Sequence, residues 1–161
     1  MDAEEFMDGY RIPFEEEAQW KKYLQENGFV VIANYVNEEK CKEYVDKFWS
    51  FLEILSENKL NKNDPETHGK NQNYPPLPFG GLVQYVGYSQ PQWELRKHCK
   101  PLFQKLWETE NVKSSFDGFC FMNGARKYEP RKHNAGLHCD QPPQKKGLWS
   151  YQGVMTLTDS G

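Results

Sequence analysis

No stretch of this sequence approaches the roughly 20 consecutive apolar residues that a helix needs to span a lipid bilayer. The amino terminus also lacks the combination of basic residues and an apolar stretch that marks a secretory signal peptide. Neither a transmembrane nor a secreted protein is indicated. We therefore expect a cytoplasmic location with no membrane partner.

Cysteine is sparse, and charge of one sign does not accumulate. Cys41, Cys99, Cys120 and Cys139 stand far apart, so no pair has the close spacing of a structural zinc site. A reduced, intracellular protein is the simplest interpretation of this pattern. The formal net charge is only -3, without an acidic or basic block, so the sequence does not indicate nucleic acid as a partner.

Aromatic residues are abundant by comparison. The 161 residues include 5 Trp, 9 Tyr and 10 Phe, which together make up 15% of the chain. This length allows one domain with a real core but not two independent ones. A core built on large flat side chains suits a sandwich or barrel with a lined pocket.

Two helices are predicted in the first third of the chain. Trp20, Tyr23 and Leu24 recur at helical spacing, and Gly28 is a suitable left-handed stop behind them. Asn37 can cap a second helix. That helix should turn one apolar stripe toward the core, made by Cys41, Val45, Phe48, Leu52 and Leu55.

The rest of the chain is expected to contain a long loop, one more helix and several strands. Residues 56–78 have few apolar positions and are typical of a surface loop. A helical stretch should begin after Ser89, be interrupted or restarted at Pro101 and end near Trp107. No helix is predicted beyond Trp107, so an α+β domain is favoured over a doubly wound parallel sheet. The predicted strands are Phe29–Ala33, Leu82–Tyr88, Phe116–Met122, which should be buried on both faces, and Tyr151–Thr158.

The residues most informative about chemistry are His138 and Asp140. Side chains alternate between the faces of a strand, so on an extended segment these two point the same way while Cys139 points oppositely. One imidazole and one carboxylate then converge on a single point. Non-haem iron(II) takes such mixed nitrogen and oxygen ligation, with a second His as the usual third ligand and open positions for co-substrates.

Two other interpretations of these residues stay open. Asp140 can simply orient His138 on a β surface without any metal. Alternatively, the chain can be a zinc protein that uses His98-Cys99 and His138-Cys139. Adjacent residues on a strand diverge, however, so each of these pairs would provide one ligand at best.

Several segments, in their order along the chain, resemble the phytanoyl-CoA dioxygenase family of iron(II)- and 2-oxoglutarate-dependent oxygenases. The chain is similar to this family over roughly residues 19 to 161. The segments that carry the resemblance are Phe29-Val30-Val31-Ile32 with Asn37-Glu38-Glu39 and the helix that follows, Ser114-Ser115-Phe116-Asp117-Gly118, Leu137-His138-Cys139-Asp140-Gln141, Gly147-Leu148, and Tyr151-Gln152-Gly153-Val154.

The resemblance implies a fold, a reaction and a set of site residues. The fold would be N-terminal helices packed on a double-stranded β-helix, also called a jelly-roll or cupin-like barrel. The cofactors would be Fe(II), held by His138 and Asp140, and 2-oxoglutarate. Gln152 would line the 2-oxoglutarate site, and Asn123 is a weaker candidate for the same role. The enzyme would use O2 to oxidise a C–H bond of a small-molecule substrate while 2-oxoglutarate is decarboxylated to succinate.

Further side chains are weaker candidates for contacts with the substrate. A substrate that bears phosphate or carboxylate could use the basic residues before the metal motif, although a solvated loop explains them as well. They are Arg126, Lys127, Arg131, Lys132 and His133. Trp149 and Tyr151 can line the substrate side or belong to the core.

This sequence departs from the family in one respect. After Asp140 there is no further His, and after Lys146 there is no Arg or Lys. The third iron ligand and the basic partner of the far carboxylate of 2-oxoglutarate are therefore missing. We expect this chain to be a fragment of a longer protein. The two alternatives are that a second polypeptide completes the barrel, or that this is a truncated form without the family's activity.

The predicted layout is one domain over residues 1–161. Residues 1–110 would form a supporting region of helices and strands that includes the long loop at 56–78. Residues 111–161 would form the first part of the jelly-roll barrel and carry the metal motif. A jelly roll needs about eight strands, and about four are predicted here, so the last strand should expose an edge that seeks a partner. A catalytically inactive domain of the same fold, binding a ligand or partner, is the main alternative to the oxygenase.

Overall fold

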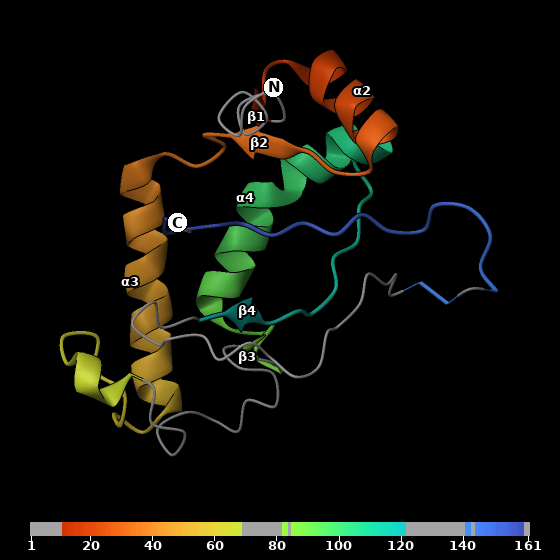
Figure 1. Cartoon of the computed structure of the whole chain (residues 1–161). Coiled ribbons are helices and arrows are strands. Elements are labelled where there is room, and N and C mark those ends of the chain that lie inside the picture. The colour runs from red at the N-terminus through yellow and green to blue at the C-terminus, as the bar shows by residue number, and fades with distance from the viewer. Residues whose placement is uncertain (1–10, 69–81, 84, 122–140, 143, 160–161) are drawn as a thin grey trace, which may run out of the picture.

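The computed structural model describes residues 11–68, 82–83, 85–121, 141–142 and 144–159. These residues form a mixture of helices and short strands (Figure 1). The elements in chain order are β1 (Arg11–Pro13), α2 (Glu17–Asn27), β2 (Val31–Ala33), α3 (Glu38–Leu55), the short 3-10 helix η1 (Pro65–Thr67), β3 (Leu82–Val83), α4 (Gln90–Trp107) and β4 (Phe119–Cys120). None of the helices in these ranges is long and apolar enough to cross a membrane.

The strands described pair two by two. β1 and β2 run parallel with α2 as their connection, and β3 and β4 run antiparallel. These two small sheets belong to a mixed helix and strand architecture, and the double-stranded β-helix stays a prediction. The sequence patterns did not predict β1, because three residues are too few to establish a period of two.

The β1–α2–β2 unit forms around one buried indole. Trp20 is 0% exposed, and its Nε1 donates a hydrogen bond to the carbonyl oxygen of Phe14 at 3.1 Å. Gly28 ends α2 in the left-handed region, at φ 79°, and its N–H donates to the carbonyl oxygen of Leu24. This confirms the predicted helix and its stop, because glycine takes a positive φ without steric penalty.

The predicted cap of α3 is confirmed. The Asn37 side chain accepts a hydrogen bond from the backbone N–H of Lys40 at 2.8 Å, so one N–H without an intrahelical partner is satisfied. Two acidic residues, Glu38 and Glu39, follow in the first turn and complement the positive end of the helix dipole.

Replacing Asn37 with alanine is expected to lower the free energy of unfolding by about 1 kcal/mol, because the N–H of Lys40 loses its acceptor. Chemical denaturation followed by circular dichroism measures the change. Asn37→Asp keeps an acceptor oxygen and should remain near the parent, as should Asn63→Ala at an exposed position. Equal losses in Asn37→Ala and Asn63→Ala would contradict a capping role.

The predicted apolar stripe of α3 faces the core, although the buried surface is wider than the stripe. Phe48 and Leu52 are buried, and the other three predicted members are half-buried. Tyr44 is also buried, at 2% exposed, although the pattern did not include it. A helix packed on its surroundings buries a face of about 100° rather than a single line of residues.

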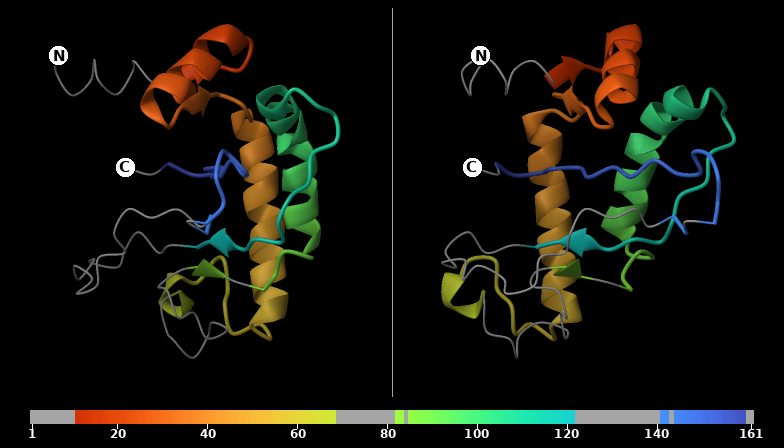
Figure 2. Two further views of the ribbon diagram at one scale, coloured as in Figure 1. Left: turned by 90° about the vertical axis from the view of Figure 1, so that its right-hand side faces the viewer. Right: turned by 45° about the vertical axis from the view of Figure 1, so that its right-hand side comes forward.

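α3 and α4 lie side by side and frame the core (Figure 2). The buried cluster consists of Leu52, Leu60, Val83 and Val86. Half-buried side chains from α3 and from the β4 region pack against it, namely Trp49, Phe51, Leu55, Phe119 and Phe121. Aromatic rings thus make up much of this core, as the composition predicts.

α4 continues through Pro101 instead of being interrupted there. The helix changes direction part-way along its length (Figure 1). Proline lacks the N–H that would bond to the carbonyl four residues earlier, and its ring crowds that carbonyl, so a bend is the expected response. The helix ends at Trp107 as predicted. Ser89 occupies the predicted capping position, but its hydroxyl makes no capping hydrogen bond.

Three strand predictions need correction. Leu82–Tyr88 is reduced to β3, because the backbone of Tyr85 has φ 63° and leaves the extended region. Phe116–Met122 is reduced to β4 and is not buried on both faces, since Phe116 is 63% exposed and Cys120 is exposed. A two-stranded sheet offers no second layer to cover that side. Residues 151–158 are not assigned as a strand.

The predicted loop at 56–78 is described only as far as residue 68. That part consists of turns around η1 and is held by Thr67, whose hydroxyl accepts from the backbone N–H of Asn61 at 3.0 Å. Residues 69–78 lie outside the described part of the chain.

Candidate functional site

The predicted iron ligands lie outside the described residues. His138 and Asp140 are both in the range 122–140, as is Asn123, the weaker candidate for the 2-oxoglutarate site. The same range holds Cys139 and the basic residues Arg126, Lys127, Arg131, Lys132 and His133. Their roles stay predictions.

A compact turn begins at Gln141, directly after the motif. The Gln141 side-chain amide donates to the carbonyl oxygens of Lys145 at 2.8 Å and Gly147 at 2.9 Å. Gly147 has φ +87°, a conformation that other residues rarely adopt. The Trp149 indole donates to the carbonyl oxygen of Lys146 at 2.8 Å, and the Lys145 ammonium stands 4.9 Å from its ring centroid. One amide side chain therefore ties the residue after Asp140 to the far end of the turn.

Gln152, the other candidate for the 2-oxoglutarate site, is exposed on an extended segment that follows this turn. The neighbouring residues attach the segment to α4. The centroids of the Tyr151 and Trp107 rings are 4.8 Å apart. The backbone of Gly153 lies so close to Phe103 that a Cβ built on this glycine would be 3.0 Å from Phe103 Cζ. Tyr151 thus packs on a helix, which favours the core role left open for it. Trp149 is 60% exposed.

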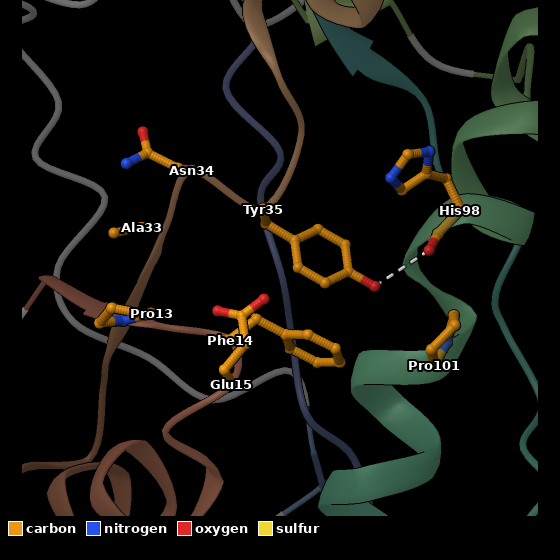
Figure 3. A pocket seen from close by; sticks show the side chains of 8 residues that line it. All are labelled: Pro13, Phe14, Glu15, Ala33, Asn34, Tyr35, His98 and Pro101. Carbon is orange, nitrogen blue, oxygen red and sulfur yellow. Dashed lines mark hydrogen bonds between the residues drawn. The ribbon is translucent and has the colours of Figure 1, made fainter.

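An open pocket of about 540 Å³ lies where the β1–α2–β2 unit meets α4 (Figure 3). Its lining comes from the ends of β1 and β2 and from the bend of α4, and consists of Pro13, Phe14, Glu15, Ala33, Asn34, Tyr35, His98 and Pro101. No local sequence pattern predicts this pocket, because its residues come from three separate segments that meet only in the folded chain.

His98 is the centre of the hydrogen bonding around this pocket. The Tyr35 hydroxyl donates to the His98 carbonyl oxygen at 3.0 Å (Figure 3). The Tyr44 hydroxyl pairs with His98 Nδ1 at 3.2 Å. Both tyrosine rings also meet the imidazole edge to face, at 5.7 and 6.0 Å between centroids. These contacts join β2, α3 and α4 beside the bend at Pro101.

Three ionisable side chains close to His98, those of Cys99, Tyr35 and Tyr44, have raised pKa values. Burial raises the pKa of the Cys99 thiol to about 11. Burial also raises the pKa of the Tyr35 hydroxyl, and the nearby Cys99 raises it further. Burial is likewise the main cause of the raised pKa of the Tyr44 hydroxyl. A thiol needs to be ionised to act as a nucleophile or a metal ligand, so Cys99 is suited to neither role. The described lining of the pocket offers hydrogen bonds and aromatic faces.

Alkylation should distinguish the cysteines. At pH 8 about one in a thousand Cys99 thiols is ionised, so iodoacetamide is expected to modify exposed Cys120 at least about 10-fold faster. The Cys99 rate should rise about tenfold per pH unit until the pH nears 11, because thiolate is the reacting form. Peptide mass spectrometry after timed quenching measures both rates. Equal rates at pH 8 would show that Cys99 is not shielded.

The residues that the structure describes do not support the alternative of a zinc protein. Within those residues no group of three or more His, Cys, Asp or Glu side chains is placed to hold a metal. His98 and Cys99 are consecutive on α4, a helix rather than a strand, and Tyr44 already pairs with the imidazole. The pair at His138-Cys139 lies outside the described part of the chain.

Comparison with known proteins gives one informative relative. A protein from Aspergillus versicolor, described as Ava biosynthesis cluster protein O, is 30% identical to this chain over 153 residues. The match covers 92% of this chain but 48% of that protein, so the chain spans about half the length of the curated relative. No model of a protein family matches the chain, and no solved structure matches it.

Proposed function

We propose that this chain carries part of the active site of an Fe(II)- and 2-oxoglutarate-dependent oxygenase similar to phytanoyl-CoA dioxygenase. The observation that carries the proposal is the sequence Leu137-His138-Cys139-Asp140-Gln141, which sets an imidazole and a carboxylate two residues apart on a predicted strand. Gln141, the residue that follows this pair, is held in an ordered turn by its own side-chain amide.

The chemistry of the donor set fits the metal. One imidazole nitrogen and one carboxylate oxygen are two of the three ligands of the usual facial arrangement for non-haem iron(II). When bound, Fe(II) with 2-oxoglutarate supplies the oxidising power for hydroxylation or a related C–H oxidation. The task of the chain is to hold the metal through His138 and Asp140 and to keep water away from the substrate.

Gln152 and Asn123 are proposed to line the 2-oxoglutarate site. An amide side chain can donate to a carboxylate oxygen of 2-oxoglutarate without adding charge. Gln152 is exposed, and its neighbours are fixed against α4, so its backbone position is well supported. The alternative role for each amide is a hydrogen bond to nearby backbone.

A further polypeptide segment or a second chain is proposed to complete the site. It would supply the third iron ligand and the basic partner of 2-oxoglutarate, since no His follows Asp140 and no Arg or Lys follows Lys146 in this sequence. The relative from Aspergillus versicolor is about twice as long as the matched region, so a protein of this kind has room for both. The description of that relative as a biosynthesis cluster protein favours a metabolic role with a small organic substrate. A cytoplasmic location is part of the proposal and rests on the cysteine pattern.

Anaerobic titration of the full chain with Fe(II) and 2-oxoglutarate tests the proposal. The expected result is the weak visible absorption band that arises when 2-oxoglutarate chelates iron(II), appearing only when both are present. If no band forms at saturating iron, the inactive domain of the same fold becomes the better interpretation. Metal analysis of protein purified without added iron checks the zinc alternative, which would be supported by one equivalent of zinc.

A further inference from the structure

The pocket beside the bend of α4 combines one carboxylate with uncovered apolar surface. Glu15 is the only acidic residue among the eight described residues that line it. Figure 3 shows the Glu15 carboxylate turned toward the space that the other side chains surround. Pro13 and Pro101 are exposed, and the rings of Phe14 and Tyr35 are half-buried. A negative charge therefore stands next to apolar groups that a ligand can cover.

The size and walls of the pocket suit a small organic molecule. Its volume of about 540 Å³ lies within the range of roughly 300 to 1,000 Å³ that is usual for small-molecule sites. The ring centroids of Phe14 and Tyr35 are 4.9 Å apart and their planes are inclined by 75°, so the two rings form an apolar corner. Such sites are mostly apolar, with a few polar groups that fix the orientation of the ligand.

The Glu15 carboxylate is available to a cation from outside. It forms no ion pair with any residue that the structure describes. The ammonium group of Lys105 stands 5.3 Å from the centroid of the Phe14 ring, but it is paired with Glu17. Glu17 also pairs with Lys21, at 2.8 Å. The positive charges on this side of the molecule are thus used by Glu17 and leave Glu15 uncompensated.

The rest of the lining favours a ligand that donates hydrogen bonds. The Tyr35 hydroxyl already donates to the carbonyl oxygen of His98 at 3.0 Å. Pro13 and Pro101 have no backbone N–H to offer. An anion such as 2-oxoglutarate would meet the negative charge of Glu15 here. A bare Mg²⁺ or Ca²⁺ would find one carboxylate where these ions need several oxygen ligands.

We propose that this pocket binds a small organic ammonium compound, with its cationic nitrogen at Glu15 and its apolar body against the rings of Phe14 and Tyr35. An ion pair at an open, hydrated position contributes little by itself. Binding therefore needs both parts of the ligand, because burial of its apolar body supplies the remainder. The inference goes beyond the proposed oxygenase and does not depend on iron.

Three probes of similar shape test the charge preference. Phenethylamine, phenethyl alcohol and phenylacetate are positive, neutral and negative at neutral pH. Each is titrated into the isotope-labelled full chain in the presence of EDTA, and the amide shifts of Glu15 and of residues 33–35 are followed by NMR. Phenethylamine should bind at least about 3-fold more tightly than the alcohol, as expected for an ion pair at a hydrated position, and phenylacetate should bind most weakly.

Charge variants of Glu15 test which residue selects the amine. Glu15→Gln should lower the affinity for phenethylamine to that for the alcohol, and Glu15→Lys should reverse the preference toward phenylacetate. Glu15 is exposed and has no ion pair among the described residues, so the melting temperature of both variants should stay near the parent. Glu16→Gln and Glu16→Lys are the matched controls. Glu16 is adjacent but does not line the pocket, and its side chain makes no capping hydrogen bond.

Both Glu16 variants should keep the preference of the parent chain for phenethylamine. Equal affinity for the three probes, or equal losses in the Glu15 and Glu16 variants, would overturn the proposal. So would amide shifts that fall outside the pocket, or an absence of shifts up to the solubility limit of phenethylamine. All these outcomes are measured without metal, so they leave the oxygenase proposal to its own titration.

Discussion

Replacing Leu52 with alanine is expected to lower the free energy of unfolding by about 2 to 5 kcal/mol. Leu52 is 1% exposed and belongs to the cluster with Leu60, Val83 and Val86, so truncation removes buried apolar contacts and leaves a cavity. Because this cluster joins α3 to the segment around β3, the loss should appear as a shift of the single cooperative transition. Urea denaturation followed by circular dichroism and by Trp fluorescence measures it.

Ile54 provides a matched control on the same helix. Its side chain is 74% exposed, so Ile54→Ala removes a similar number of carbons without opening a cavity, and the free energy of unfolding should change by less than about 0.5 kcal/mol. A similar loss in both variants would mean that the cost comes from helix propensity and not from packing. An unchanged midpoint in Leu52→Ala would show that α3 is not docked on the core.

Replacing His138 or Asp140 with alanine is expected to weaken Fe(II) binding by more than about 10-fold, because loss of even an outer partner of a metal ligand typically costs 10- to 100-fold in affinity. Calorimetric titration of Fe(II) under anaerobic conditions measures the effect. The melting temperature in metal-free buffer should stay close to that of the parent, because ligands at the mouth of a barrel do not usually belong to the core.

His133→Ala is the matched control for the metal site. It removes an imidazole only five residues before His138, at a position that the motif does not assign to the metal. Iron affinity should therefore be retained. Equal weakening by His133→Ala and His138→Ala would point to a diffuse histidine effect. A collapse of the metal-free melting temperature in either ligand variant would show that the residue supports the fold and not the metal.

Local patterns predicted the helices well. Trp20 and Gly28 in α2 and the Asn37 cap of α3 all act within a few residues of their own position, so spacing alone is informative about them. Pro101 was harder to interpret, because a proline can end a helix or bend it. The outcome depends on whether tertiary contacts hold the two halves together. Here the Tyr35 hydroxyl bonds to the His98 carbonyl oxygen next to the bend.

The predicted strand Phe29–Ala33 is confirmed in part as β2, but the other three strand predictions needed correction, for a related reason. A strand exists only when a partner lies beside it, and the partner can come from anywhere in the chain. Three-residue β1 forms because β2 lies next to it, at a register of Ile12 to Ile32. Tyr151–Thr158 has the composition of a strand but is not assigned as one. The pocket around His98 escaped prediction for the same reason, since three distant segments meet there.

The sequence by itself determined the three helices, the cap and stop that limit them, the aromatic character of the core and the pair of candidate ligands at His138 and Asp140. Each of these depends on residue type and on short-range spacing. Only the tertiary structure decided which strands pair, how α4 accommodates Pro101, that Cys99 is a shielded thiol, and that Tyr151 and Gly153 pack on α4. These properties depend on contacts between distant segments, whose free energy cannot be read from any local window of the sequence.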